Sequence, residues 1–332
     1  MFVVKPQITL PAIDSWNLTI QRQLSNTSSL EIAYIGTIGT HVFAGGSDYD
    51  PNQPRIDGFG FTSTNARKPF FQRYGWSQNL RYFGSDATSR YHALQVKFEK
   101  RLSSGLNVMS HFTYSKNIDY TNVYYNQDAA LARGISQNSR PKAFVFTANY
   151  NLPFGKGQKF GNNLAKPLDL MLGGWQMNGV MNWFSGLGFT PTYQNCGADQ
   201  DVGVCRPDAV GNVFASDPTQ YGWFNTASAV LASNGATSGP WQRPQRGKLG
   251  TVGRNRLIGP AFQQIDFSLF KTFSLTEKYR VQFRAESFNL ANRTNLAAPN
   301  TCVDCPGVAG RIFNTYVTYV PRTVQFALRL DF

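Results

Sequence analysis

Segments in which apolar and polar residues alternate recur throughout this chain, and this alternation is the period of a β-strand with one buried and one wet face. The alternation predicts nine strands, at 16–24, 30–38, 91–101, 106–116, 142–152, 172–185, 264–274, 279–290 and 322–332. Residues 1–10 offer a tenth. Apolar spacing of three and four residues is nowhere sustained over a helix length, so the predicted fold class is all-β.

The connections between these strands alternate in length. Short links at 25–29, 103–105 and 275–278 alternate with long ones of about 52, 25, 78 and 31 residues, and the intermediate link 153–171 falls in the short series. All long loops therefore lie at one end of the sheet. Outer-membrane barrels sort their connections this way, with short periplasmic turns and long extracellular loops, so the pattern favours an antiparallel transmembrane β-barrel of about nine to ten strands.

Aromatic residues recur near the strand ends, as the interface girdles of a membrane barrel require. In strand 172–185 the outward series is Trp175, Met177, Gly179, Met181 and Trp183. With a rise of ~3.3 Å per residue and ~40° tilt, the two tryptophans span roughly 20 Å of the membrane normal, close to the ~25 Å apolar band. The further girdle candidates are Trp16, Tyr91, Tyr114, Tyr150 and Tyr279.

Three basic residues, Arg22, Lys100 and Lys271, interrupt the apolar faces. Each lies toward a strand end that joins a short turn, where a long stem can snorkel to lipid phosphate. At that depth a cation costs about 0 to 1 kcal/mol, against roughly 2 to 4 at mid-membrane.

The opposite faces are polar and would line the lumen of a barrel. The charged candidates for this lining are Lys97, Glu99, Arg280, Arg284, Glu286 and Arg329. In a soluble sandwich the same residues would form the solvated face, and alternation within single strands does not decide between the two.

Composition narrows the class of protein. Charged residues make up only 15% of the 332, against roughly 25% in an ordinary soluble domain, and no apolar run approaches the ~18 residues of a membrane helix. The net charge of +13 suggests anionic partners, but the basic residues are scattered singly, so nucleic-acid binding is not expected. The opening "MFVVKPQITL" lacks the pattern of a signal peptide.

Catalytic and cofactor chemistry are not expected. His41, His92 and His111 are scattered, and no catalytic or phosphate-binding motif accompanies them. The four cysteines fall in two long loops, Cys196 with Cys205 and Cys302 with Cys305, which predicts two local disulfides in an oxidising compartment. A four-cysteine zinc site is the alternative, because "CVDC" has ligand spacing.

Several segments resemble a known family in the expected order. They include "DSWNLTIQRQL", "YHALQVKFEKRLSSGLNVMSHFTYSKNID", "QIDFSLFKTFSLTEKYRVQFRAESFNLANRTNL" and the closing "TVQFALRLDF". From about residue 14 to 332 the chain resembles the C-terminal barrel of TonB-dependent outer-membrane receptors, in particular the Oar-like acidobacterial type.

The resemblance implies a 22-stranded barrel in the cell outer membrane, plugged by an N-terminal domain and driven by the TonB complex through an N-terminal box. Neither the plug domain, the box nor a signal peptide is recognisable here, so residues 1–332 are expected to be the C-terminal segment of such a barrel. The implied partners are outer-membrane lipid, the TonB complex acting through the missing N-terminal region, and a transported ligand that the sequence does not identify.

The final strand carries Phe326, Leu328, Leu330 and Phe332 on one face. In the family it resembles, a last strand that ends in an aromatic residue is the signal read by the barrel-assembly machinery. Such a strand can be recognised by strand addition. The plainer alternative is an edge strand that ends the chain.

The expected function is uptake of a large nutrient, such as a metal chelate, a cobalamin-like cofactor or an oligosaccharide. Two alternatives are a non-transport barrel that acts as adhesin or surface scaffold, and a secreted soluble β carbohydrate-binding protein. Loop aromatics could stack on a ligand or simply pack loop against loop; they are Tyr193, Tyr221, Trp223, Phe224 and Trp241.

Overall fold

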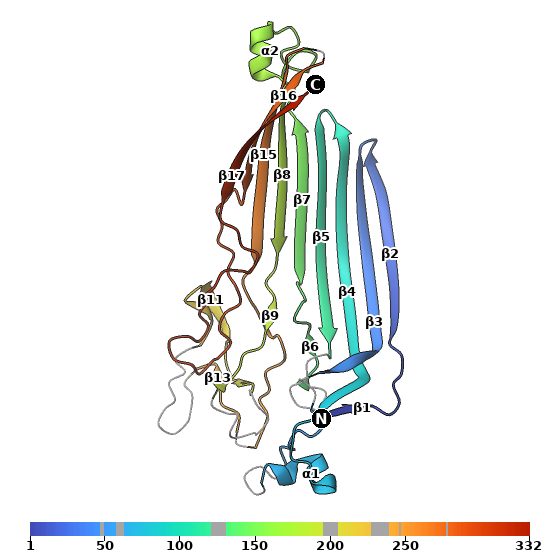
Figure 1. Ribbon diagram of the computed structural model, residues 1–332, viewed down its shortest axis with the longest axis vertical. Helices are drawn as coiled ribbons and strands as arrows, with labels where there is room; N and C mark the ends of the chain where they lie inside the picture. The colour runs from blue at the N-terminus through green and yellow to red at the C-terminus, as the bar shows by residue number, and fades with distance from the viewer. Residues whose placement is uncertain are drawn as a thin grey trace.

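The computed structural model describes residues 1–46, 50–57, 63–120, 131–194, 205–226, 239–245, 247–276 and 278–332. Within these ranges the chain forms one large sheet with a layer of loops at one end (Figure 1). None of the described helices is long and apolar enough to cross a membrane.

Nine long strands form the body of the sheet in the described part of the chain, and the nine predicted strands are confirmed. They are β2 (Ala12–Ser25), β3 (Ser28–Gly46), β4 (Arg81–Ser103), β5 (Leu106–Asp119), β7 (Lys142–Asn151), β8 (Trp175–Phe184), β15 (Phe262–Ser274), β16 (Arg280–Phe288) and β17 (Thr323–Asp331). Each pairs antiparallel with the next one along the chain, so the order is β17-β16-β15-β8-β7-β5-β4-β3-β2.

The predicted bounds are wrong in three places. β3 and β4 extend to Gly46 and back to Arg81, because residues expected in the loop 39–90 keep pairing across two register shifts. The link before β8 contains a short helix, α2 (Lys166–Leu172), so the strand starts at Trp175 rather than 172. The segment 1–10 supplies only β1 (Phe2–Val4), which pairs parallel with the extension of β4.

The long loops carry short elements that alternation did not predict. They are β6 (Gly134–Ile135), β9 (Gly188–Phe189), β10 (Asp208–Ala209), β11 (Phe214–Thr219), β12 (Gly222–Phe224), β13 (Trp241–Gln242), β14 (Leu257–Ile258), η1 (Asn65–Arg67) and α1 (Pro69–Tyr74). Most of these strands are only two or three residues long and hold too few positions to show a period.

Short turns gather at one end of the sheet and long loops at the other. In Figure 1 the turns between β2 and β3 and between β4 and β5 lie at the top with α2, whereas β1, α1, β11 and β13 lie at the bottom. The β4–β5 turn is a two-residue hairpin in which Ser104 and Gly105 both have positive φ, of 51° and 77°. This turn type matches the twist of the flanking strands. The predicted sorting of connections is confirmed.

The strand registers give the sheet one apolar and one polar face. One row across six strands is wholly apolar: Trp183, Phe144, Phe112, Val96, Ile32 and Ile20. The next row, one residue along each strand, is mostly polar: Asn182, Val145, His111, Lys97, Glu31 and Gln21. A single alternation is therefore kept in register over the width of the sheet.

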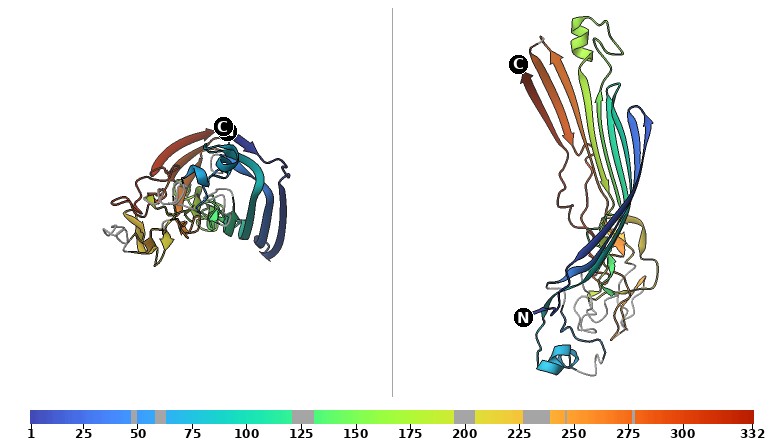
Figure 2. Two further views of the ribbon diagram at one scale, coloured as in Figure 1. Left: turned by 90° about the horizontal axis from the view of Figure 1, so that it is seen from below. Right: turned by 90° about the vertical axis from the view of Figure 1, so that its right-hand side faces the viewer.

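The apolar face is not covered by a second layer of described residues. No residue of β8, β16 or β17 is buried, and in β15 only Lys271 is. On β17 the exposed fractions of Phe326 and Leu328 are 70% and 75%. A sandwich would bury one face of each sheet against the other. Seen from below, the strands instead form a single curved row from β17 in red to β2 in blue (Figure 2).

The one compact core among the described residues lies in the loop layer, not in the sheet. Its members are Phe189, Tyr193, Cys205, Val213, Phe224, Trp241, Val252, Leu257 and Val303. Three of the five loop aromatics singled out from the sequence, Tyr193, Phe224 and Trp241, are thus buried, and Trp223 packs against them. Tyr221 is exposed. The described residues of the loops 185–261 and 289–322 form a folded platform at the end of the sheet.

Candidate functional site

The polar face of the sheet holds all six charged residues proposed for the lumen. Lys97 and Glu99 of β4 form an ion pair of 3.4 Å, and Glu99 also lies 3.9 Å from Arg101. Near the other edge of the sheet, on the same face, Arg284 donates to Gln282 at 2.7 Å. Glu286 accepts from Gln325, Arg329 donates to Asp331 at 2.8 Å, and Arg280 lies opposite Asp331. The two groups are separated by several strands and form no single charged centre.

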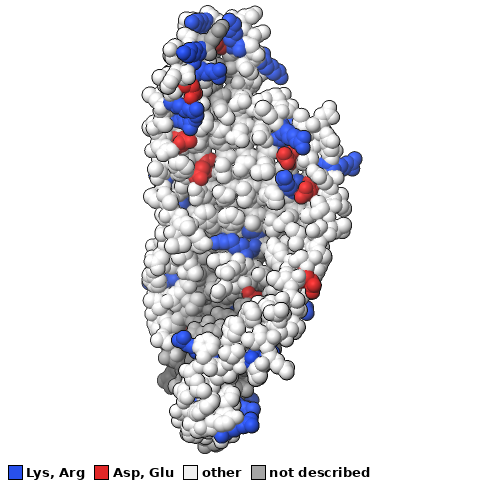
Figure 3. Space-filling model, turned by 45° about the vertical axis from the view of Figure 1, so that its right-hand side comes forward, with Lys and Arg blue, Asp and Glu red and all other residues white. Residues whose placement is uncertain are grey.

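Five of these six residues have a side-chain partner on their own or the adjacent strand, and Arg280 lies opposite Asp331. The charged groups of these five residues are therefore partnered within the sheet itself. Side chains two residues apart on one strand, or directly opposite on adjacent strands, bond to one another. Figure 3 shows the charges of one side as small groups separated by uncharged surface, rather than as a continuous basic patch.

The apolar face carries aromatic residues near both ends. At the loop end Trp16, Tyr34 and His92 meet, with a 2.8 Å hydrogen bond between Tyr34 Oη and His92 Nδ1. Toward the turn end lie Trp175 and, level with Met177, Tyr150. The interpretation of Tyr91 as a girdle residue is wrong: it lies opposite Thr37 and Asn117 on the polar face, because it is one residue out of phase.

The prediction that Lys271 extends from the apolar face to lipid phosphate is wrong. It is buried, its ammonium donates to the Gly173 carbonyl oxygen, and it lies 5.2 Å from the ring centroids of Trp175 and Phe273. The turn before β8 folds back over the strand end and supplies this acceptor. Lys271 therefore fastens the turn to the sheet instead of meeting solvent or lipid.

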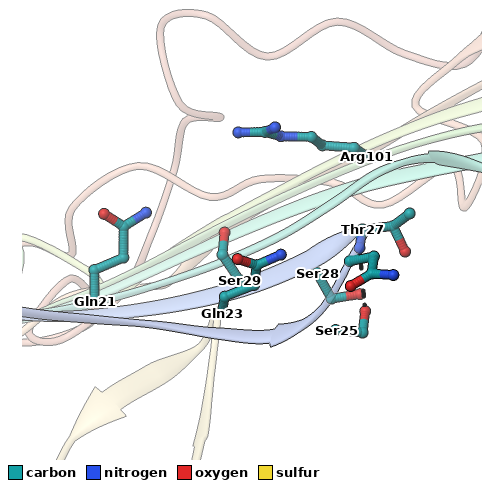
Figure 4. A pocket seen from close by; sticks show the side chains of 8 residues that line it. Gln21, Gln23, Ser25, Thr27, Ser28, Ser29 and Arg101 are labelled. Carbon is teal, nitrogen blue, oxygen red and sulfur yellow. Dashed lines mark hydrogen bonds between the residues drawn. The ribbon is translucent and has the colours of Figure 1, made fainter.

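A polar hollow of about 340 Å³ lies at the short-turn end of β2 and β3. Figure 4 shows Gln21, Gln23 and Ser29 on one side of the hairpin, with Arg101 above them. One wall of this hollow is β2, and every residue of β2 is exposed at the edge of the sheet. The hollow is therefore incomplete as a binding site.

A second pocket lies at the loop end of the polar face, around Arg140. The guanidinium donates to the Ser185 carbonyl oxygen and to Tyr316 Oη, both at 2.8 Å. It also lies 5.7 Å and 5.5 Å from the ring centroids of Phe184 and Tyr316. Alternation did not point to Arg140, because the residue precedes β7 and its partners are far away in sequence.

The loop platform is fastened to the sheet by buried arginines. Arg254 forms an ion pair with Asp119 at the end of β5 and also donates to the carbonyl oxygens of Gly134 and Ile135. Burial lowers the pKa of Arg254. Arg206 donates to the Leu131 carbonyl oxygen at 2.7 Å. These bonds hold the loop before β15 against the loop before β7.

The family model described as outer membrane beta barrel domain matches residues 1–325. This match covers almost the whole chain. The chain belongs to the outer membrane beta barrel domain family. The barrel domain accordingly lies in the cell outer membrane, and its sheet is an antiparallel transmembrane barrel wall.

Several solved structures resemble the barrel domain at low identity. The ferric-catecholate import receptor Fiu of E. coli K12 aligns with 98% of this chain at 9% identity and a TM-score of 0.44. The ferric preacinetobactin receptor BauA of Acinetobacter baumannii aligns with 96% at 14% identity and 0.46. The chain spans 28% and 29% of the length of these two proteins. No curated protein sequence matches the barrel domain.

The described cysteines of the barrel domain, Cys205, Cys302 and Cys305, lie in its loop platform. Cys302 and Cys305 form a disulfide, and Cys205 is also disulfide-bonded. Its expected partner, Cys196, lies outside the described residues. Cys302, Asp304 and Cys305 are close enough together to hold a metal ion, but their two sulfur atoms are joined to each other, which leaves no thiolate for zinc.

Proposed function

We propose that this barrel domain is the C-terminal part of a TonB-dependent transporter that takes up a large nutrient across the outer membrane. The single observation that carries the proposal is the two-faced sheet, which has an uncovered apolar face and a polar face that carries charged side chains. Such a wall suits lipid on one side and a wet lumen on the other. A soluble carbohydrate-binding protein would leave that apolar face in water.

The edges of the sheet support the proposal that further strands complete the barrel. Within the described residues β2 pairs only with β3, and β17 only with β16. Eight antiparallel steps separate the two edge strands, so β2 and β17 run in the same direction. Joining them directly would make a parallel pair. An antiparallel barrel therefore needs an odd number of additional strands between them, as a larger receptor barrel would supply.

The face of β17 supports recognition by the barrel-assembly machinery. Val324, Phe326, Leu328, Leu330 and Phe332 are all more than half exposed. The strand ends at the short-turn end of the sheet, the periplasmic side in this proposal (Figure 1). An unpaired edge with an apolar side can be captured by strand addition from a partner in the periplasm.

The test is nutrient uptake by cells that lack the gene. We expect slower growth when one large nutrient is limiting, among iron chelates, cobalamin and oligosaccharides, and restoration by the intact gene. Because the proposed transport is energised from the inner membrane, a protonophore should abolish uptake while surface binding persists. Unchanged uptake of every nutrient, together with reduced attachment of the cells to surfaces, would refute transport in favour of an adhesin.

A further inference from the structure

The Arg140 pocket has the form of a small-ligand site. Its volume is about 300 Å³, at the lower end of the range for ligand pockets. Its lining comes from Arg140, from the residues at the start of β15, from Leu187 after β8, and from two stretches of the segment 289–322. The lining residues are Arg140, Leu187, Gly259, Pro260, Phe262, Leu296, Ala297, Ala298, Thr315, Tyr316 and Val317. Most of these side chains are apolar.

The walls of the pocket are held in place by hydrogen bonds outside it. Asn295 accepts from the Gln263 amide at 2.8 Å and donates to the Gln263 carbonyl oxygen at 2.9 Å, which fixes the segment to the start of β15. The Tyr316 amide donates to the Asn295 carbonyl oxygen at 2.7 Å. The Gly259 amide donates to the Leu187 carbonyl oxygen at 2.8 Å. A ligand would therefore meet preformed walls.

Aromatic rings form one side of the site. Phe262 lies 6.1 Å from Phe184 and 5.6 Å from Tyr316, measured between ring centroids. Two of these three rings also flank the Arg140 guanidinium. A flat apolar group in the pocket would contact Phe262 and Tyr316.

Arg140 is the single charged residue among the lining residues. Two of its N–H groups are directed to Ser185 and Tyr316, which fixes the plane of the guanidinium, and the guanidinium carries five N–H groups in all. A planar carboxylate matches such a group in charge and in shape.

We propose that this pocket binds a small ligand, or a terminal group of a larger one, made of a flat apolar body and a carboxylate. The carboxylate pairs with Arg140, and the body lies against Phe262, Tyr316 and Leu296. The inference rests on the proposed uptake function for its biological role, because the pocket lies at the loop end of the polar face, where an incoming nutrient would enter.

The test is the binding of benzoate to the detergent-solubilised protein, measured by saturation-transfer NMR. We expect benzoate to bind more tightly than benzyl alcohol or benzylamine, which have the same ring without the negative charge. Arg140→Gln should weaken benzoate binding about ten-fold or more, since it removes a charged hydrogen-bond donor. Arg311→Gln is the matched control, because Arg311 also lies over loop aromatics but outside the pocket.

A second pair of variants keeps the test sharp if Arg140→Gln fails to fold. Val317 lines the pocket and is 92% exposed, so a charge there leaves the packing intact. Val317→Asp should weaken benzoate binding and Val317→Lys should strengthen it, each by about three- to five-fold. Val320→Asp, in the same segment but outside the pocket, should change nothing.

Equal binding of benzoate and benzyl alcohol would overturn the proposal, and so would no binding or equal affinities of the two Val317 variants. If a variant that is unable to bind benzoate still takes up the nutrient normally, the role of the pocket in uptake is refuted and the proposed uptake function is not. Benzoate binding in a protein that transports nothing would refute the proposed uptake and leave the pocket standing.

Discussion

Asp119, the last residue of β5, forms a buried ion pair with Arg254, which lies 135 residues further along the chain. The side chains are only 11% and 6% exposed. Asp119 belongs to the sheet and Arg254 to the loop platform, so the pair joins the membrane-spanning wall to the structure that covers its outer end. The arginine also caps two carbonyl oxygens of the neighbouring loop, Gly134 and Ile135.

Breaking this pair should loosen the loop platform without unfolding the sheet. Arg254→Met removes one member of a buried ion pair, and losses of about 3 to 5 kcal/mol are typical for such changes. We expect proteolytic cleavage within 131–140 and 247–260 at protease concentrations that leave the parent intact, whereas migration on an unheated SDS gel stays unchanged. Arg256→Gln is the control, because Arg256 belongs to the same loop but lies over the Phe214 ring instead of Asp119. A protease pattern identical to that of the parent would contradict the assigned role of the pair.

The two faces of β8 should respond oppositely to a charge. Met181 lies opposite Phe146 and Ile265 on the apolar face, and its neighbour Val180 lies opposite Thr147 and Asp266 on the polar face. Met181→Lys should therefore destabilise the folded protein by about 1 to 3 kcal/mol, because Met181 lies between the bilayer midplane and the interface at Trp183, and Val180→Lys by much less. Urea unfolding in lipid vesicles measures both. Equal losses would mean that the apolar face does not meet hydrocarbon.

The last residue should govern assembly rather than final stability. Phe332 is 85% exposed and lies beyond the end of the β16–β17 pairing, so Phe332→Ala removes little packing within the chain. We expect several-fold less folded protein in the outer membrane, measured by heat-modifiable migration of membrane fractions. Asp331→Asn, at the adjacent position, should assemble normally. If the Phe332 variant accumulated at the parental level, the proposed assembly signal would be wrong.

Tyr193 should make the loop platform sensitive to high pH. Burial raises the pKa of Tyr193, and the nearby Asp304 carboxylate raises it further. Since the folded state holds the proton more tightly than the unfolded chain, the contribution of this group is fully present below pH ~10 and falls as the pH rises through the raised value. Alkaline titration of the platform, followed by protease sensitivity, should show a transition that Tyr193→Phe moves to higher pH. An unchanged transition would mean that another group controls it.

The alternating pattern was enough to predict the nine long strands, since a half-wet strand repeats its environment every two residues. It also predicted the outward series from Trp175 to Trp183 and the turn at Ser104 and Gly105. It failed for strands that are too short to show a period, such as β9 and β10. It also failed at Tyr91, which is one residue out of phase and therefore lies on the polar face. The buried position of Lys271 was beyond it, because the acceptor on Gly173 comes from a turn that folds back onto the strand.

The sequence by itself determined the strands, their order along the chain and the polarity of each strand face, because these depend on residues one or two positions apart. Only the tertiary structure decided that the apolar faces align into one uncovered surface, since that depends on the register between strands. It alone brought Asp119 to Arg254 and Arg140 to Ser185 and Tyr316. Contacts between residues so distant along the chain leave no local period, because they depend on how the loops lie over the end of the sheet.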